Sequence, residues 1–160
     1  MPSPSEKLVD LREVSAPVTV DLPLSLGIPF GYVPDQNIRL RLYRRMADLK
    51  DEAEIAALAD EYADRFGALP EEVSNLLFQM KVKLLAEQAG LASVSIENEQ
   101  VVLRYPPLPE GMPGRSLSNL GAHVRTGKNA YWMPVGSGND WKERLLACLT
   151  TIIQLEQSGI

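Results

Sequence analysis

One stretch decides the fold: Asp60-Glu61-Tyr62-Ala63-Asp64-Arg65-Phe66-Gly67-Ala68-Leu69-Pro70-Glu71-Glu72-Val73. It predicts the end of one helix, a tight reversal and the start of a second helix. Leu58, Tyr62 and Phe66 recur every four residues, so they lie on one face of a helix. Gly67 follows directly, where a helix commonly ends in a left-handed conformation that glycine adopts without steric cost. Pro70 suits the first turn of the next helix, because its missing N–H would have no helical partner there.

The periodicity on either side of this stretch predicts an α+β fold. An N-terminal helical part is expected to pack on a small antiparallel β-sheet, and a C-terminal helix is expected to close the domain. The segment 110–121 is predicted to be a loop with one short helical turn near Leu117. The predicted elements are, in chain order, a strand at 18–22, helices at 36–49, 52–66 and 70–89, a β-hairpin at 94–105, strands at 123–125 and 130–135, and a helix at 140–156.

The composition is typical of a soluble globular protein. The chain has 160 residues, 45% of them hydrophobic and 23% charged, which is enough to bury one core. Residues 1–17 are polar and rich in proline, so we expect a linker or an added segment there, followed by one α+β domain over 18–157. No apolar run is long enough to cross a bilayer, and the first residues lack the apolar core of a signal peptide. We therefore expect a cytoplasmic protein without a membrane partner.

Residues that could carry catalysis or hold a metal are sparse. His123 falls in a predicted strand and has no serine, cysteine or carboxylate partner nearby in sequence, which favours a structural or solvent-facing role. The segment from Gly121 to Lys128 superficially resembles a phosphate-binding loop. Its glycines are separated by one residue too many, and Asn129 replaces the serine or threonine that would hold magnesium. Cys148 is expected to be a buried, inert thiol. We therefore expect no catalytic residue, metal or cofactor in this domain.

Opposite charges are concentrated in two neighbouring predicted helices. The net charge of −5 argues against a dedicated nucleic-acid-binding protein. The helix at 52–66 is acidic, and its Glu54, Glu61 and Asp64 lie off the apolar stripe, so they are expected to face water or a partner. The segment 36–50 carries one acidic residue, Asp48, and five basic residues, which are Arg39, Arg41, Arg44, Arg45 and Lys50.

The arginines allow two interpretations. Arg41, Arg44 and Arg45 are spaced to share a helix surface and could contact phosphates or carboxylates through their planar guanidinium groups. A solvated face, or salt bridges to the acidic helix that follows, explains them equally well. From the residues alone, the chain is therefore predicted to be an α+β interaction module.

Five motifs carry a resemblance to a known family. They are Val18-Thr19-Val20-Asp21-Leu22-Pro23, Ile28-Pro29, Tyr32-Val33-Pro34-Asp35, Arg39-Leu40-Arg41-Leu42-Tyr43-Arg44-Arg45 and Asp64-Arg65-Phe66-Gly67-Ala68-Leu69-Pro70. Their order and spacing over residues 18–90 resemble the C-terminal domain of bacterial transcription-repair coupling factors (Mfd), and the last motif is the distinctive one. From Val94 onward the resemblance is one of element pattern.

The resemblance implies that the chain is one domain of a large DNA-repair protein. Such proteins bind RNA polymerase stalled at a lesion, translocate on DNA with ATP and magnesium held by other domains, and recruit the excision-repair protein UvrA. The family's C-terminal domain is regulatory. It packs against a UvrB-like N-terminal module, covers the surface that UvrA would use, and restrains the motor until polymerase is engaged.

On this basis the acidic helix is expected to be the partner interface. We expect Glu61 to contribute most, followed by Asp64 and Glu54, through arginines on the UvrB-like module. Arg65 is expected to be structural, either bonding the last helical carbonyls or pairing with Glu61. The alternative function is a nucleic-acid-binding accessory domain that uses the four arginines from Arg39 to Arg45.

Overall fold

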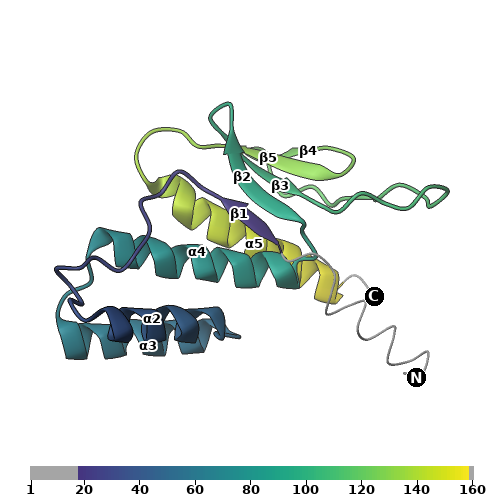
Figure 1. Ribbon diagram of the computed structural model, residues 1–160. Helices are drawn as coiled ribbons and strands as arrows, with labels where there is room; N and C mark the ends of the chain where they lie inside the picture. The colour runs from purple at the N-terminus through teal and green to yellow at the C-terminus, as the bar shows by residue number, and fades with distance from the viewer. Residues whose placement is uncertain (1–17, 159–160) are drawn as a thin grey trace, which may run out of the picture.

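The computed structural model describes residues 18–158, which form a β-sheet and two helical layers stacked on it (Figure 1). The sheet covers one side of α4 and α5, and α2 and α3 lie on the other side of α4. The predicted segment 1–17 lies outside the described residues. The elements are β1 (Thr19–Asp21), α2 (Gln36–Ala47), α3 (Glu52–Phe66), α4 (Glu71–Gln88), β2 (Ser93–Glu97), β3 (Gln100–Arg104), β4 (Arg125–Thr126), β5 (Ala130–Pro134) and α5 (Asp140–Ser158).

The sheet is mixed, which corrects the prediction of an antiparallel sheet. Its strand order is β1-β2-β3-β5-β4. The pairs β2–β3, β3–β5 and β4–β5 are antiparallel, whereas β1 pairs with β2 in parallel, with Val20 opposite Val94. A parallel pair needs a long crossover connection, and here α2, α3 and α4 together form that connection. The α+β fold class is confirmed.

Helix α4 is the element shared by two hydrophobic cores. Val73 and Leu77 belong to the core formed with α2 and α3. Val82 and Leu85 belong to the core formed with α5 and the inner face of the sheet. A helix that is apolar on opposite sides must be buried on both. The predicted helical part therefore contacts the sheet through α4, and α2 and α3 pack on the far side of that helix.

The reversal between α3 and α4 forms at the predicted position, although Pro70 directly precedes the first helical residue, Glu71, and is not part of the first turn. Helix α3 ends at Gly67, which has a φ of 96° and donates its N–H to the Ala63 carbonyl at 3.0 Å. Pro70 is the N-cap of α4, and its carbonyl accepts hydrogen bonds from the N–H groups of Val73 and Ser74 at 3.1 and 3.0 Å. The short reversal holds α3 antiparallel to α4, and this fixes the position of the acidic helix on the surface of the domain.

Two loop positions differ from the prediction. His123 lies in a turn just before β4 and not in a strand, because β4 is shorter than predicted. No helical turn forms near Leu117. This segment is held by side-chain contacts in place of helical hydrogen bonds. Arg115 Nε donates to Asn129 Oδ1 at 2.8 Å, and the Tyr131 hydroxyl donates to the Ser118 carbonyl at 2.9 Å.

The described helices include none that combines the length and the apolarity required to span a membrane.

The reversal yields a stability prediction at Gly67. A φ of 96° is unfavourable for any residue with a Cβ, whereas a Cβ placed there would meet no atom within 4 Å. We expect Gly67→Ala to lower the free energy of unfolding by about 1–2 kcal/mol through backbone strain alone. Urea unfolding followed by circular dichroism measures this change.

Gly114→Ala is the matched control, because its Cβ would also meet no atom within 4 Å and its φ lies outside the left-handed range. We expect a change within about 0.5 kcal/mol for this exposed site. Equal losses at both glycines would contradict a conformational role for Gly67.

Candidate functional site

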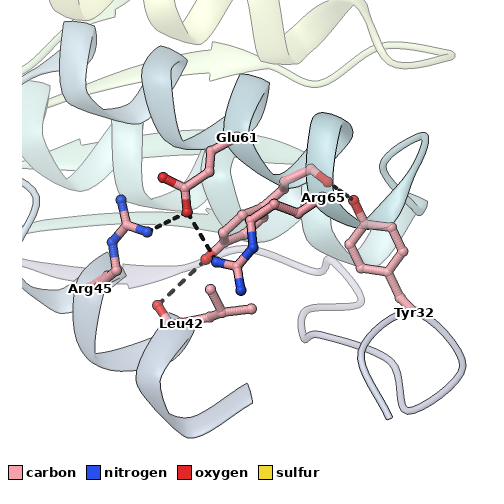
Figure 2. Close-up of polar contacts among 6 residues, drawn as sticks. Tyr32, Leu42, Arg45, Glu61 and Arg65 are labelled. Atoms are coloured by element: carbon pink, nitrogen blue, oxygen red, sulfur yellow. Dashed lines mark hydrogen bonds and ion pairs between the residues drawn. The ribbon is translucent and has the colours of Figure 1, made fainter. Parts of the chain in front are cut away.

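The candidate site is centred on Glu61, at the exposed seam between α2 and α3 (Figure 2). Its Oε2 atom accepts a hydrogen bond from Arg45 Nη1 of α2 at 2.5 Å and another from Arg65 Nη1 of α3 at 3.3 Å. The carboxylate therefore joins the basic helix to the acidic one. For Arg45, this confirms the interpretation that the arginines form salt bridges to the next helix, and Arg65 pairs with Glu61 as predicted.

The ion pair changes the ionisation of its members and remains half exposed. The hydrogen bond from Arg45 lowers the pKa of the Glu61 carboxyl, and the same bond raises the pKa of Arg45. The side chains of Arg45 and Glu61 are 51% and 35% exposed. Water therefore screens the pair, and such surface pairs contribute at most about 1 kcal/mol. Arg45 and Glu61 are therefore held together in the free domain, but separating them costs little free energy.

An aromatic cluster lies beneath the charged residues and holds the end of α3. Tyr62 is fully buried, and burial raises its pKa to about 12. The ring of Phe66 packs between those of Tyr32 and Tyr62, with centroid distances of 5.7 and 6.3 Å. The Tyr32 hydroxyl lies 3.1 Å from the Tyr62 carbonyl and 2.8 Å from that of Gly67, where helix-end carbonyls lack helical partners. The last turn of α3, which carries Glu61, is therefore held in place by this aromatic cluster.

The other two predicted acidic residues lie in different environments. Asp64 is exposed, one turn from Glu61, and forms no salt bridge with any residue between 18 and 158. Glu54 belongs to the start of α3. Its Oε2 accepts from the Lys50 N–H at 2.7 Å, and its own N–H donates to Asp51 Oδ1 at 2.8 Å. This reciprocal arrangement resembles a capping box, a signal that the spacing of Asp51 and Glu54 already contained. The structure therefore groups Asp64 with Glu61 and separates Glu54 from them.

The remaining arginines of α2 have different surroundings. Arg39 Nη1 donates to the carbonyls of Val33 and Pro34 at 2.8 and 2.9 Å, so it holds the loop that precedes the helix. Arg41 and Arg44 are exposed and form no salt bridge with any described residue. Arg45 is therefore the one predicted arginine of α2 that pairs with a carboxylate of the described residues, and Arg39 is held by backbone carbonyls.

The described part of the chain contains no cluster of metal-ligating side chains, and its cysteine is buried. Among residues 18–158, no three histidine, cysteine, aspartate or glutamate side chains are placed to share a metal ion. Burial raises the pKa of the Cys148 thiol to about 11, so this group is protonated and weakly nucleophilic at neutral pH.

The ion pair predicts a specific pH dependence of stability. The pKa of Glu61 is lowered in the folded domain, so its contribution is present above the ordinary carboxyl pKa and is lost as the pH falls through the lowered value. We expect Glu61→Gln to reduce the free energy of unfolding at neutral pH by at most about 1 kcal/mol. Urea titrations of both proteins at decreasing pH should show this difference shrinking. A difference that grows on acidification would contradict the assignment.

Comparisons with known sequences all point to one protein family. The sequence model of the TRCF domain matches residues 22–113, more than half of the chain. The transcription-repair-coupling factor of Rickettsia bellii is 39% identical over 87 residues, which cover 54% of this chain and 8% of that protein. The Mycobacterium bovis protein of the same name is 33% identical over 121 residues, covering 74% and 10%. The Staphylococcus haemolyticus protein is 28% identical over 159 residues, covering 92% and 14%.

A solved structure has the same fold. The crystal structure of the C-terminal domain of transcription-repair coupling factor superimposes with a TM-score of 0.72 at 19% identity, covering 91% of this chain and 98% of that one. The chain spans about a tenth of the length of the curated relatives it matches. This chain shares the fold of that C-terminal domain, and the match of the family model over more than half of its length establishes that it belongs to the TRCF domain family.

Proposed function

We propose that this domain is a regulatory module that covers another part of its own protein. Its α3 face docks on the UvrB-like N-terminal module and masks the surface that UvrA would use, until the protein engages stalled RNA polymerase. One observation carries the proposal: Glu61 is partly exposed between two arginines, and Asp64, which forms no salt bridge with a described residue, lies one turn away. A mask that has to be removed is better served by such a polar face than by a large apolar one.

The contact works by exchange of ion-pair partners. Glu61 is bound to Arg45 in the free domain, and both side chains are open enough to water for this pair to be weak. An arginine of the UvrB-like module replaces Arg45 on the carboxylate, and a second cation pairs with Asp64. Each close pair at a partly desolvated interface contributes about 1–3 kcal/mol. The free and docked states therefore differ little in energy, which suits a regulated contact.

The aromatic cluster of Tyr32, Tyr62 and Phe66 supports the specificity of this contact. Tyr62 is fully buried, and the Tyr32 hydroxyl lies 2.8 Å from the Gly67 carbonyl, which fixes the last turn of α3. Glu61 and Asp64 are therefore positioned before the partner arrives, and binding need not order them. Glu54 contributes less, because its carboxylate already accepts a hydrogen bond from the Lys50 N–H, just before the helix.

The proposal assigns the remaining activities to the rest of the parent protein. The ATP-driven translocation on DNA, with its ATP and magnesium, and the contact with RNA polymerase belong to other domains. The described residues of this chain include no site of three or more metal-ligating side chains.

Calorimetric titration of this chain into the separately produced UvrB-like module tests the proposal. We expect binding that Glu61→Arg weakens at least tenfold, because each lost pair and the repulsion that replaces it cost more than about 1.4 kcal/mol. Added salt should weaken the binding of the unmodified domain, since exposed charges are screened.

Glu97→Arg is the matched control. Glu97 forms an equally exposed salt bridge with Arg104, on the sheet and away from α3, and the variant makes the same charge change. Equal losses for both variants would reject a contact centred on Glu61. Absence of binding by the folded, unmodified domain would reject the masking role itself.

The nucleic-acid alternative is favoured by one observation, the uncompensated charge of Arg41 and Arg44. It would require retention of the domain on heparin at moderate salt and loss of retention in an Arg41→Glu, Arg44→Glu variant.

A further inference from the structure

A pocket of about 450 Å³ opens between the end of α5 and the loop that joins β3 to β4. Its lining combines two opposite charges, Arg115 and Glu156, with the side chains of Tyr105, Tyr131 and Ile152. The sheet and α5 lie on one side of α4, whereas α2 and α3 lie on the other (Figure 1). The pocket is therefore separate from the α3 face centred on Glu61.

Hydrogen bonds hold the loop wall of the pocket in place. Arg115 Nε donates to Asn129 Oδ1 at 2.8 Å, and Arg115 Nη2 donates to the Pro106 carbonyl at 2.7 Å. The Tyr131 hydroxyl donates to the Ser118 carbonyl at 2.9 Å. A partner that enters the pocket therefore need not order this wall, which lowers the entropic cost of binding.

Arg115 brings a positive charge to the pocket. It forms no salt bridge with any residue between 18 and 158. Its guanidinium lies 5.0 Å from the centroid of the Tyr105 ring, which keeps it beside the pocket. A guanidinium has more N–H donors than the two bonds to Asn129 and Pro106 use, and these suit a carboxylate.

Glu156 brings the opposite charge, on the last turns of α5. Its carboxylate lies close to the end of α4, since a Cβ at Gly90 would be 4.0 Å from Glu156 Oε1. Partial burial raises the pKa of this carboxyl, and it forms no salt bridge with a described residue. A cation brought by a partner would offset the cost of this desolvation.

Both charges act on the same buried floor. Tyr105, Tyr131 and Ile152 are 8%, 2% and 3% exposed. Burial is the main cause of the raised pKa of Tyr105, and among the smaller effects Glu156 raises this pKa and Arg115 lowers it. Arg115 and Glu156 nevertheless form no salt bridge with each other. The pocket therefore offers two separate charges of opposite sign beside an apolar floor.

This arrangement favours a protein segment over a nucleic acid. The rings of Tyr105 and Tyr131 are too buried to stack with bases, and Arg115 lies over the first of them. A phosphate chain that reached Arg115 would also meet the negative charge of Glu156. A segment with side chains of both signs avoids this repulsion.

The surroundings of Glu156 favour an extended segment over a small molecule. Glu156 also lines a second hollow, of about 390 Å³, together with Gln88 of α4 and with Ile153 and Gln157 of α5. An extended segment that passes Glu156 contacts both hollows, whereas a compact ligand fills only one of them.

We infer that this pocket binds an extended protein segment with side chains of both charges. The segment places a carboxylate on Arg115, an apolar side chain over Ile152, and a lysine or arginine beside Glu156. This contact does not depend on the masking role proposed above, because other elements of the fold carry it.

The test is a two-dimensional NMR titration of the ¹⁵N-labelled chain. The probes are two pentapeptides with blocked ends, Gly-Glu-Phe-Lys-Gly and Gly-Lys-Phe-Glu-Gly, since a segment can cross the pocket in either direction. We expect one of them to shift the amides of residues 115–118 and 152–156. Replacement of its glutamate or its lysine by glutamine should weaken binding about tenfold. A short DNA duplex should leave these amides unchanged.

Two variants and a matched control locate the contact. Glu156→Gln should weaken the better peptide about tenfold and should not affect the relative in which glutamine replaces lysine. Arg115→Gln should act in the same way through the glutamate of the peptide. Glu143→Gln removes the same charge from an exposed position of α5, more than three turns from Glu156, and should leave binding unchanged. Glu156→Gln decides the matter if Arg115→Gln also displaces the loop.

Four results would overturn the inference. No shift of residues 115–118 and 152–156 at millimolar peptide, in either order, would reject a site for this class of partner. Equal binding by the glutamine relatives would remove the role of the two charges. Equal losses in Glu156→Gln and Glu143→Gln would place the contact elsewhere. Shifts caused by the duplex and not by the peptides would assign the pocket to nucleic acid.

Discussion

The burial of α4 on two sides is the constraint on which the rest of the structure depends. Val73 and Leu77 are covered by α2 and α3, and Val82 and Leu85 are covered by α5 and the sheet. No other described element belongs so fully to both cores. The hairpin of α2 and α3 therefore stays outside the sheet core, attached through one helix. Its other surfaces remain free to carry charge, and the opposed basic and acidic helices are a consequence of that peripheral position.

The sequence predicted local structure well because local physics decides it. The helix boundaries around Gly67 and Pro70 follow from backbone preferences of those two residues, and the hairpin of β2 and β3 follows from alternation. The parallel pairing of β1 with β2 could not be predicted, because it joins segments separated by three helices and leaves no periodic signal of its own. The sequence predicts a strand at His123, which is wrong, because a two-residue β4 is too short for alternation to define its ends.

The sequence predicts which charged residues of α3 are exposed, but it does not predict which arginine pairs with them. A stripe pattern places Glu61 and Asp64 off the buried face of α3, but it cannot say which arginine of the preceding helix reaches them. The register between α2 and α3 decides this, and it selects Arg45, which lies 2.5 Å from Glu61. Glu54 has the same charge and the same exposed position in the pattern, yet its backbone contact with Lys50 gives it a structural task. The charge pattern of the sequence therefore cannot distinguish Glu61, which pairs with an arginine, from Glu54, which bonds to the backbone.

The brevity of the outer strands limits how this sheet can associate with other chains. The sheet ends in β1 on one side and β4 on the other, with three and two residues. Each edge offers few unpaired backbone groups, so strands from neighbouring molecules find little to extend. The fold is thereby protected at both edges against pairing with a second copy of itself.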